Sequence, residues 1–240
     1  MTAGLSSLMP KQFGKDLKEG LRPVFDLVYP PRCPSCGAAT ANHGALCLDC
    51  WGELEFPAAE KNESEQDARH SGIIAATIYN DMSRSLILKF KHGGKIALAP
   101  LLGRMIASRI HTKDGVTPLI IPVPLHRTRI WQRGFNQAAM LAQELAKAGK
   151  GELFIDALVR RKRTQSLGNL SSEKRHEILR GAIALNAKAR DAVKGRSVIL
   201  VDDVLTSGAT SAACVDALLG AGAAEVRIAC FAKTRTGSRS

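Results

Sequence analysis

The segment 198–210 restricts the fold more than any other part of the chain. It opens with an unbroken apolar run, which is typical of a strand buried on both faces of a parallel sheet. Asp202 and Asp203 follow at once, and a turn rich in hydroxyl groups and glycine comes next. The apolar spacing of Ser211–Leu219 then predicts a helix. We therefore expect a strand–turn–helix unit with two carboxylates at the carboxyl end of its strand.

The turn in this unit has the chemistry of a phosphate site. The first N–H groups of a helix lack partners and carry partial positive charge, so they attract phosphate. Gly208 lets the backbone approach a ligand, and carboxylates can accept hydrogen bonds from the hydroxyl groups of an adjacent sugar. The candidate binding residues are Asp202, Asp203, Thr206, Ser207, Gly208, Ala209 and Thr210. An ordinary strand–turn–helix with solvated acidic residues at its tip is the alternative.

The same segment resembles the signature of type I phosphoribosyltransferases. In that family an apolar strand leads to Asp-Asp, two further residues, and then Thr-Thr/Ser-Gly-x-Thr. The resemblance implies that the acidic pair contacts the ribose 2′- and 3′-hydroxyl groups of phosphoribosyl diphosphate (PRPP), and that the turn holds its 5′-phosphate. The sequence contains neither the Gly-Lys-Ser/Thr of a P-loop nor a G-x-G-x-x-G motif.

Two Cys-x-x-Cys pairs lie near the beginning of the chain. Cys33 and Cys36 form the first pair, and Cys47 and Cys50 the second, with ten residues between the pairs. This spacing predicts a tetrahedral zinc site with four thiolate ligands. A module this small needs a metal to fold, so we expect the zinc to be structural rather than catalytic. Disulfides or a redox pair are the alternatives.

Strand-like and helix-like segments alternate from residue 71 onward, which predicts an α/β fold with a doubly wound parallel sheet. The resemblance described above implies that this sheet is similar to that of type I phosphoribosyltransferases. Ligands of such sheets bind at the carboxyl ends of the strands. The candidate strands are 73–79, 119–123, 158–160, 197–204 and 225–232, and the candidate helices are 83–92, 96–110, 136–148 and 211–219. The predicted organisation is an N-terminal helix and zinc-binding module at 1–56, a linker at 57–70, a phosphoribosyltransferase-like domain at 71–234 and a basic tail at 235–240.

The helix at 83–92 carries two more specific expectations. Asp81 is the candidate residue to cap its N-terminus. Its apolar residues are expected to point inward, and Lys91 outward to solvent.

Two basic segments offer further anion-binding groups. The first follows the strand at 119–123, where phosphoribosyltransferases hold the diphosphate, and its candidates are Pro124, Arg127, Arg129 and Arg133. The second is the loop 161–175, where Arg163 is the candidate. In related transferases a flexible hood closes over the diphosphate at this point. Solvated basic loops, or a nucleic-acid contact for the second one, are the alternatives.

Taken together, the motifs resemble the competence protein F (ComF) family. In order they are the four-cysteine module, Pro122-Val123-Pro124, Arg133-Gly134-Phe135-Asn136-Gln137, the basic loop with Arg163-Thr164-Gln165-Ser166-Leu167, and the segment from Asp202 to Thr210. The resemblance implies a PRPP-binding protein associated with DNA uptake and nucleotide metabolism, with Mg²⁺ bound alongside PRPP. The catalytic residues that it implies are Asp202, Asp203, Arg129, Arg133 and Arg163.

The charge of the chain leaves two classes of function open. A net charge of +12, from 34 basic and 22 acidic residues, suits a polyanionic ligand, nucleic acid or an acidic partner. The first class is an enzyme that transfers the phosphoribosyl group of PRPP, or a protein that binds PRPP or a nucleotide 5′-phosphate. The second is a non-catalytic accessory protein that binds single-stranded DNA and DNA-processing partners. The sequence has no apolar run long enough for a membrane span and no signal-peptide core, so we expect a cytoplasmic location.

Overall fold

The computed structural model describes residues 27–58, 70–92, 96–112, 115–161 and 181–235. The chain divides into two compact units, residues 1–47 and 48–240. The candidate basic residue Arg163 lies outside the described residues, as do most of the candidate N-terminal helix, of the linker and of the basic tail.

The described part of the first unit is built around a tight turn at the first cysteine pair. Gly37 has a positive φ of 83° and donates its N–H to the carbonyl of Cys33 at 2.9 Å. Cys33 in turn donates to the carbonyl of Ala38 at 2.7 Å, and Arg32 forms an antiparallel bridge with Ala39. Glycine is favoured at position 37 because side chains make this left-handed backbone conformation costly.

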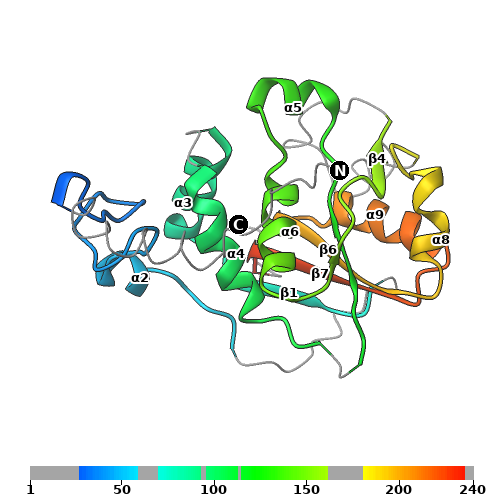
Figure 1. Cartoon of the computed structure of the whole chain (residues 1–240), viewed down its shortest axis with the longest axis horizontal. Helices are drawn as coiled ribbons and strands as arrows, with labels where there is room; N and C mark the ends of the chain where they lie inside the picture. Colours follow the sequence, from blue (N-terminus) through cyan, green and yellow to red (C-terminus); the bar gives the residue numbers. More distant parts are fainter. Residues whose placement is uncertain (1–26, 59–69, 93–95, 113–114, 162–180, 236–240) are drawn as a thin grey trace, which may run out of the picture. The chain divides into compact units, whose positions relative to one another are not determined.

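The second unit has a five-stranded parallel sheet, as the alternation of strands and helices predicted (Figure 1). The strand order is β1-β7-β6-β2-β3, and β4 and β5 form a separate antiparallel pair. The strands are β1 (Ile73–Ile78), β2 (Leu119–Pro122), β3 (Glu152–Leu153), β4 (Leu158–Arg160), β5 (Ile183–Leu185), β6 (Ser197–Leu205) and β7 (Glu225–Lys233). The helices are α2 (Leu48–Gly52), α3 (Asp81–His92), α4 (Ala99–Ala107), α5 (Arg127–Arg133), α6 (Gln137–Lys147), α8 (Arg190–Val193) and α9 (Ala209–Leu219), with 3₁₀ turns at Ile96–Leu98 and Ala187–Ala189.

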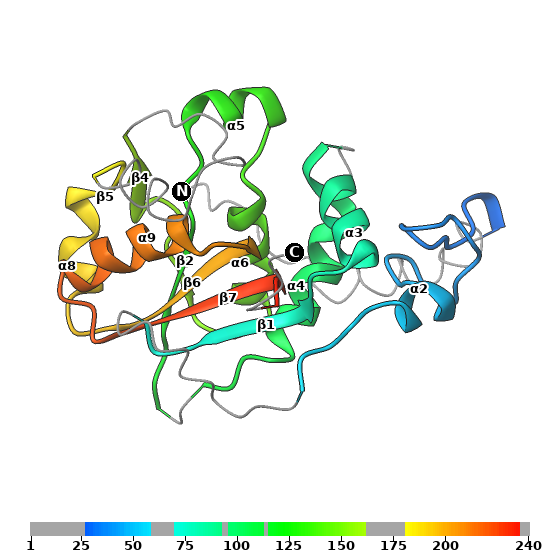
Figure 2. The same cartoon turned by 180° about the vertical axis from the view of Figure 1, so that it is seen from behind.

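Helices cover both faces of this sheet, so its central strands are buried. Helices α4 and α6 pack on each other and on one face, and α9 packs on β6 and β7 from the other (Figures 1 and 2). The apolar run 198–201 at the start of β6 is almost fully buried. Removal of such side chains from water on both faces is the main source of stability in a sheet of this kind.

The structure corrects the predicted cap of α3. The helix begins at Asp81, but Asn80 caps it: the Asn80 Oδ1 accepts the Ser83 N–H at 2.9 Å, and the Ser83 Oγ accepts the Asn80 N–H at 2.8 Å. The two residues therefore satisfy each other's backbone donors. The helix starts two residues before the predicted position, which places Asp81 inside its first turn.

Five short elements of the second unit were not predicted: α2, α5, α8, β3 and β5. Helix α5 is short and has no buried residue, so it lacks the apolar stripe that identifies a helix in a sequence. Strand β3 is two residues long. The candidate strand at 158–160 exists as β4, but it pairs with β5 outside the main sheet, because the short run at 183–185 offers it an antiparallel partner.

Candidate functional site

The phosphate turn lies between the carboxyl end of β6 and the first residue of α9. Gly208 occupies the N-cap position with a φ of 69°, and it has no side chain that could cap the helix. Thr206 and Ser207 are exposed, and the Thr234 hydroxyl after β7 donates to the Thr206 carbonyl at 3.3 Å. By contrast, Asn136 caps α6 with its own side chain. The first turn of α9 therefore leaves its N–H groups available to a ligand.

The acidic pair lies inside β6 rather than after it. Asp202 pairs in register with Cys230 of β7, and the strand continues to Leu205. Successive side chains of a strand point to opposite faces. Most of their neighbours agree with this: Cys214 of α9 and Arg160 of β4 interact electrostatically with Asp202, and Arg133 of α5 with Asp203, while Lys91 of α3 acts on both carboxylates.

Asp202 is the carboxyl group of the pair that resists ionisation. Burial raises the pKa of Asp202 to about 7, and the negative charge of Asp203 adds to this effect. The Asp203 N–H, which donates to Asp202 Oδ1 at 2.8 Å, opposes it, as do the charges of Lys91 and Arg160. Asp202 therefore exchanges a proton with solvent near neutral pH.

Lys91 is a member of this site that sequence reasoning missed. Its Nζ lies 2.9 Å from Asp203 Oδ2, and the two side chains are only 22% and 11% exposed. The prediction that Lys91 faces solvent was wrong. Helical periodicity gives the direction in which a side chain leaves the helix, but the aliphatic part of a lysine is long enough to return its charge to the protein.

Three guanidinium groups gather near the acidic pair, two of them predicted and one not. Burial lowers the pKa of Arg133, and the charge of Arg129 lowers it further while Asp203 raises it. Burial likewise lowers the pKa of Arg160, with Arg129 acting in the same direction and Asp202 against it. Arginine stays charged despite such shifts. The mutual repulsion of Arg129 with both neighbours indicates a site that an anion would stabilise.

The loop that follows β2 is fixed to β6 and shapes the first basic segment. The Val123 N–H donates to the Val201 carbonyl at 2.9 Å, and Asn136 Nδ2 donates to the Val123 carbonyl at 3.2 Å. His126 caps α5, because its Nδ1 accepts the Thr128 N–H at 3.3 Å. Of the remaining candidates in this segment, Pro124 is buried and Arg127 is exposed.

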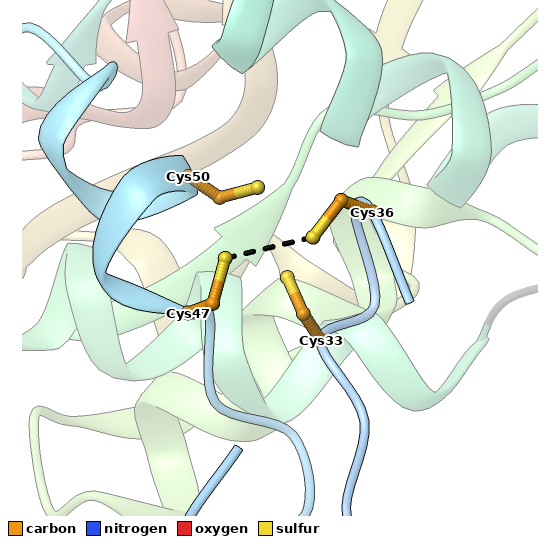
Figure 3. A group of neighbouring side chains, drawn as sticks. All are labelled: Cys33, Cys36, Cys47 and Cys50. Carbon is orange, nitrogen blue, oxygen red and sulfur yellow. Dashed lines mark hydrogen bonds between the residues drawn. The ribbon is translucent and has the colours of Figure 1, made fainter. Parts of the chain in front are cut away.

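The four N-terminal cysteines come together as a metal site would require (Figure 3). All four sulfur atoms lie within 4.8 Å of one another, and the Sγ atoms of Cys36 and Cys47 are 3.5 Å apart. Four thiolates around one zinc ion are about 3.8 Å apart, given Zn–S bonds of about 2.3 Å. Burial would raise the pKa of Cys33, but N–H groups of Cys36, Cys47 and Ser35 lower it to about 6. The donor set therefore fits zinc.

Comparison with known proteins gives two family matches and a set of relatives. A double zinc ribbon domain model matches residues 24–62, and a phosphoribosyl transferase domain model matches residues 130–239. A DNA utilization protein YhgH of Shigella flexneri is 30% identical over 84% of this chain and 90% of its own length. The chain belongs to the ComF family. Two further ComF relatives match. Competence protein F of Haemophilus influenzae is 31% identical over 68% of this chain and 74% of its own length. Competence protein ComFC of Bacillus subtilis is 29% identical over 74% of this chain and 67% of its own length.

Most of the residues predicted for this ComF protein surround one edge of its sheet. Asp202 and Asp203 are joined by Arg129 and Arg133, and the turn 206–210 follows directly on β6. Arg160 and Lys91 were not among the predicted site residues, and Arg163 lies outside the described residues. The zinc ribbon match and the cysteine cluster support a structural zinc ion. No helix among the described residues is long and apolar enough to cross a membrane.

Proposed function

We propose that this ComF protein binds PRPP at the carboxyl edge of its sheet and transfers the phosphoribosyl group to a nitrogen nucleophile. In this proposal Asp202 and Asp203 accept hydrogen bonds from the ribose hydroxyl groups. Thr206, Ser207, Gly208, Ala209 and Thr210 hold the 5′-phosphate at the N-terminus of α9. Arg129 and Arg133, together with Arg163, bind the diphosphate, beside Pro124 and Arg127.

One observation carries the proposal: a single strand–turn–helix unit places the acidic pair next to an uncapped helix N-terminus, with guanidinium groups around the same pair. A ligand that satisfies all three features has hydroxyl groups in the middle and anionic groups at both ends. PRPP has this distribution of groups. The phosphoribosyl transferase domain match supports the same reading.

The proposed transfer depends on charge that moves onto the diphosphate. The bond from the anomeric carbon to the diphosphate oxygen breaks and its electron pair leaves with diphosphate, while a carbon–nitrogen bond forms and the acceptor nitrogen loses a proton to solvent. Because the negative charge of the diphosphate grows, Arg129 and Arg133 stabilise the transition state more than the ground state. Mg²⁺ bound with PRPP would share that charge.

Calorimetry with PRPP and Mg²⁺ tests the proposal. We expect the wild type to bind, and an Asp202→Asn/Asp203→Asn double variant to bind at least about 100-fold more weakly, since two hydrogen bonds with charged acceptors are worth about 1.5–3 kcal/mol each. Asp156→Asn, which removes an exposed carboxylate outside the site, serves as control. A wild type that does not bind PRPP overturns the proposal. If the protein binds PRPP but releases no diphosphate in the presence of nitrogenous bases, it is a PRPP sensor and not a transferase.

A second candidate function, contact with single-stranded DNA, is favoured by the surface of α5. None of its residues is buried, and Trp131 is 89% exposed. Arg127, Arg129 and Arg133 lie on the same short helix. Proteins that bind single strands combine aromatic rings, on which bases stack, with cationic side chains for the phosphates. The relatives named for DNA utilization and competence agree with this reading.

Affinity for a thymidine oligonucleotide, measured against salt concentration, tests this second function. We expect Trp131→Ala to weaken binding by about 5- to 150-fold, because stacking of one base is worth about 1–3 kcal/mol. Affinity should also fall with salt, with a slope near −2 if three arginines contact phosphates. Trp51→Phe is the control, since Trp51 packs against Phe56 with their ring centroids 5.4 Å apart. A flat salt dependence, or equal affinity of the Trp131 variant, would exclude α5 as the contact.

A further inference from the structure

The last turn of α3 brings a cation from the edge of the sheet to its central acidic pair. Helix α3 follows β1, and β7 separates β1 from β6, which carries Asp203. Lys91 nevertheless reaches Asp203, with Nζ 2.9 Å from Oδ2. The two residues are far apart in sequence and belong to different elements, so only the tertiary fold brings them together.

The backbone beneath Lys91 is firmly anchored. Phe90 is fully buried, and its ring centroid lies 5.9 Å from that of Phe135, in the connection between α5 and α6. Leu86 and Ile87 of the same helix are also buried. Lys91 therefore extends from a fixed point, and holding its side chain in place costs less entropy than it would for a lysine on a mobile surface.

The second cation near Asp203 is engaged elsewhere. Arg133 donates through Nη1 to Gln137 Oε1 at 3.2 Å, and Gln137 is only 2% exposed. Arg133 thus attracts Asp203 electrostatically from a distance, while Lys91 contacts the carboxylate directly. A carboxylate has about four lone-pair positions, so one ammonium group leaves room for hydrogen bonds from a sugar.

We propose that Lys91 is a positioning residue of the acidic pair, whose ammonium group holds the Asp203 carboxylate in the orientation that receives a ribose hydroxyl group. The inference rests on the proposed function and deepens it, since it adds α3 to the elements that form the sugar site. Lys91 acts through Asp203 and not on the phosphate. Its loss should therefore affect ligands that carry the ribose hydroxyl groups and spare a ligand that fills only the phosphate turn.

Calorimetry with two probes separates these effects. Ribose 5-phosphate reports on the sugar hydroxyl groups together with the anion-binding groups, and inorganic phosphate reports on the anion-binding groups without the sugar. We expect Lys91→Met to weaken ribose 5-phosphate binding by about 10- to 100-fold and phosphate binding by less than about threefold. Lys91→Arg should recover most of the loss, because its guanidinium group can pair with the same carboxylate. Arg84→Met removes an exposed cation from the same helix and should leave both affinities unchanged.

A double-mutant cycle tests the route through Asp203. If Lys91 acts on that carboxylate, Lys91→Met should cost nothing further in an Asp203→Asn background. Two results would overturn the inference: equal ribose 5-phosphate affinity of Lys91→Met and wild type, or tighter binding by the variant, which would mean that Lys91 blocks the site. Lys91→Gln repeats the test if the Met variant melts below the assay temperature. A wild type that binds neither PRPP nor ribose 5-phosphate would overturn the proposed function itself.

Discussion

Removal of zinc is expected to unfold the N-terminal unit while the sheet of the second unit stays folded. Among residues 27–47, the described part of the first unit, Cys33 is the only buried residue. This described part therefore has no apolar core that could replace the metal, and structural zinc sites of this type supply about 10–16 kcal/mol. The second unit has its own buried core on both faces of its sheet.

Hydrogen exchange with and without a strong chelator measures this effect. We expect rapid exchange throughout residues 30–50 after chelation, and unchanged protection in β6 and β7. Cys36→Ser should reproduce the loss and lower the zinc content below one ion per chain. Cys214→Ala is the matched control, because it removes a buried thiol of α9 that lies outside the cluster. The prediction would be contradicted if the metal-free wild type kept residues 30–50 fully protected from hydrogen exchange, or if the cysteine pairs proved to be disulfides.

Asp202→Asn is expected to stabilise the protein most at alkaline pH and by a smaller amount, about a third of the full effect, at pH 5. Burial and the charge of Asp203 raise the pKa of Asp202 to about 7, from an ordinary value of 3.8. Between these two values the folded chain binds more protons than the unfolded chain, so the free energy of unfolding falls as the pH rises from about 4 to about 7. At about 1.4 kcal/mol per pKa unit, the penalty above pH 7 reaches at most about 4 kcal/mol.

Thermal unfolding of wild type and variant between pH 5 and pH 8.5 gives the readout. Asparagine removes the charge, and its carbonyl oxygen can still accept the Asp203 N–H that now donates to Asp202 at 2.8 Å. We expect the melting temperature of the variant to exceed that of wild type by about 5 °C or more at pH 8.5. Parallel pH profiles for the two proteins would show that Asp202 ionises normally. Asp156→Asn should follow the wild-type profile, because its carboxylate is exposed.

Much of the fold is predictable from sequence because its signals are local. The run 198–201 is apolar throughout, which is typical of a strand buried on both faces, and it lies at the start of β6. The zinc site was predictable for the same reason, because the spacing of the two Cys-x-x-Cys pairs is a signal contained in one short segment. Helix α5 had no such signal: none of its residues is buried, and a side-chain cap from His126 rather than an apolar stripe fixes where it begins. The domain boundaries at 56/57, 70/71 and 234/235 stay predictions.

The site was predictable only where its residues are contiguous in sequence. Asp202, Asp203 and the turn that ends at Thr210 form one segment, and the fold places that segment at the edge of the sheet. Lys91 and Arg160 join it from α3 and β4, and their positions depend on packing that periodicity does not encode. A lysine at the end of an amphipathic helix is usually solvated, so its sequence context contained no sign of the ion pair with Asp203.

The pairing of β1 with β7 has a consequence for synthesis of the chain. Strand β1 lies at the edge of the main sheet with β7 as its neighbour, and Ile73 pairs with Ile228, 155 positions later. At about 5–20 residues per second, a ribosome needs roughly 8–30 s to cover that distance. During this interval the apolar segment Ile73–Ile78 has emerged without its partner strand and is open to association with other chains. Efficient folding in a cell therefore depends on how well this one segment is shielded until the last strand of the sheet is made.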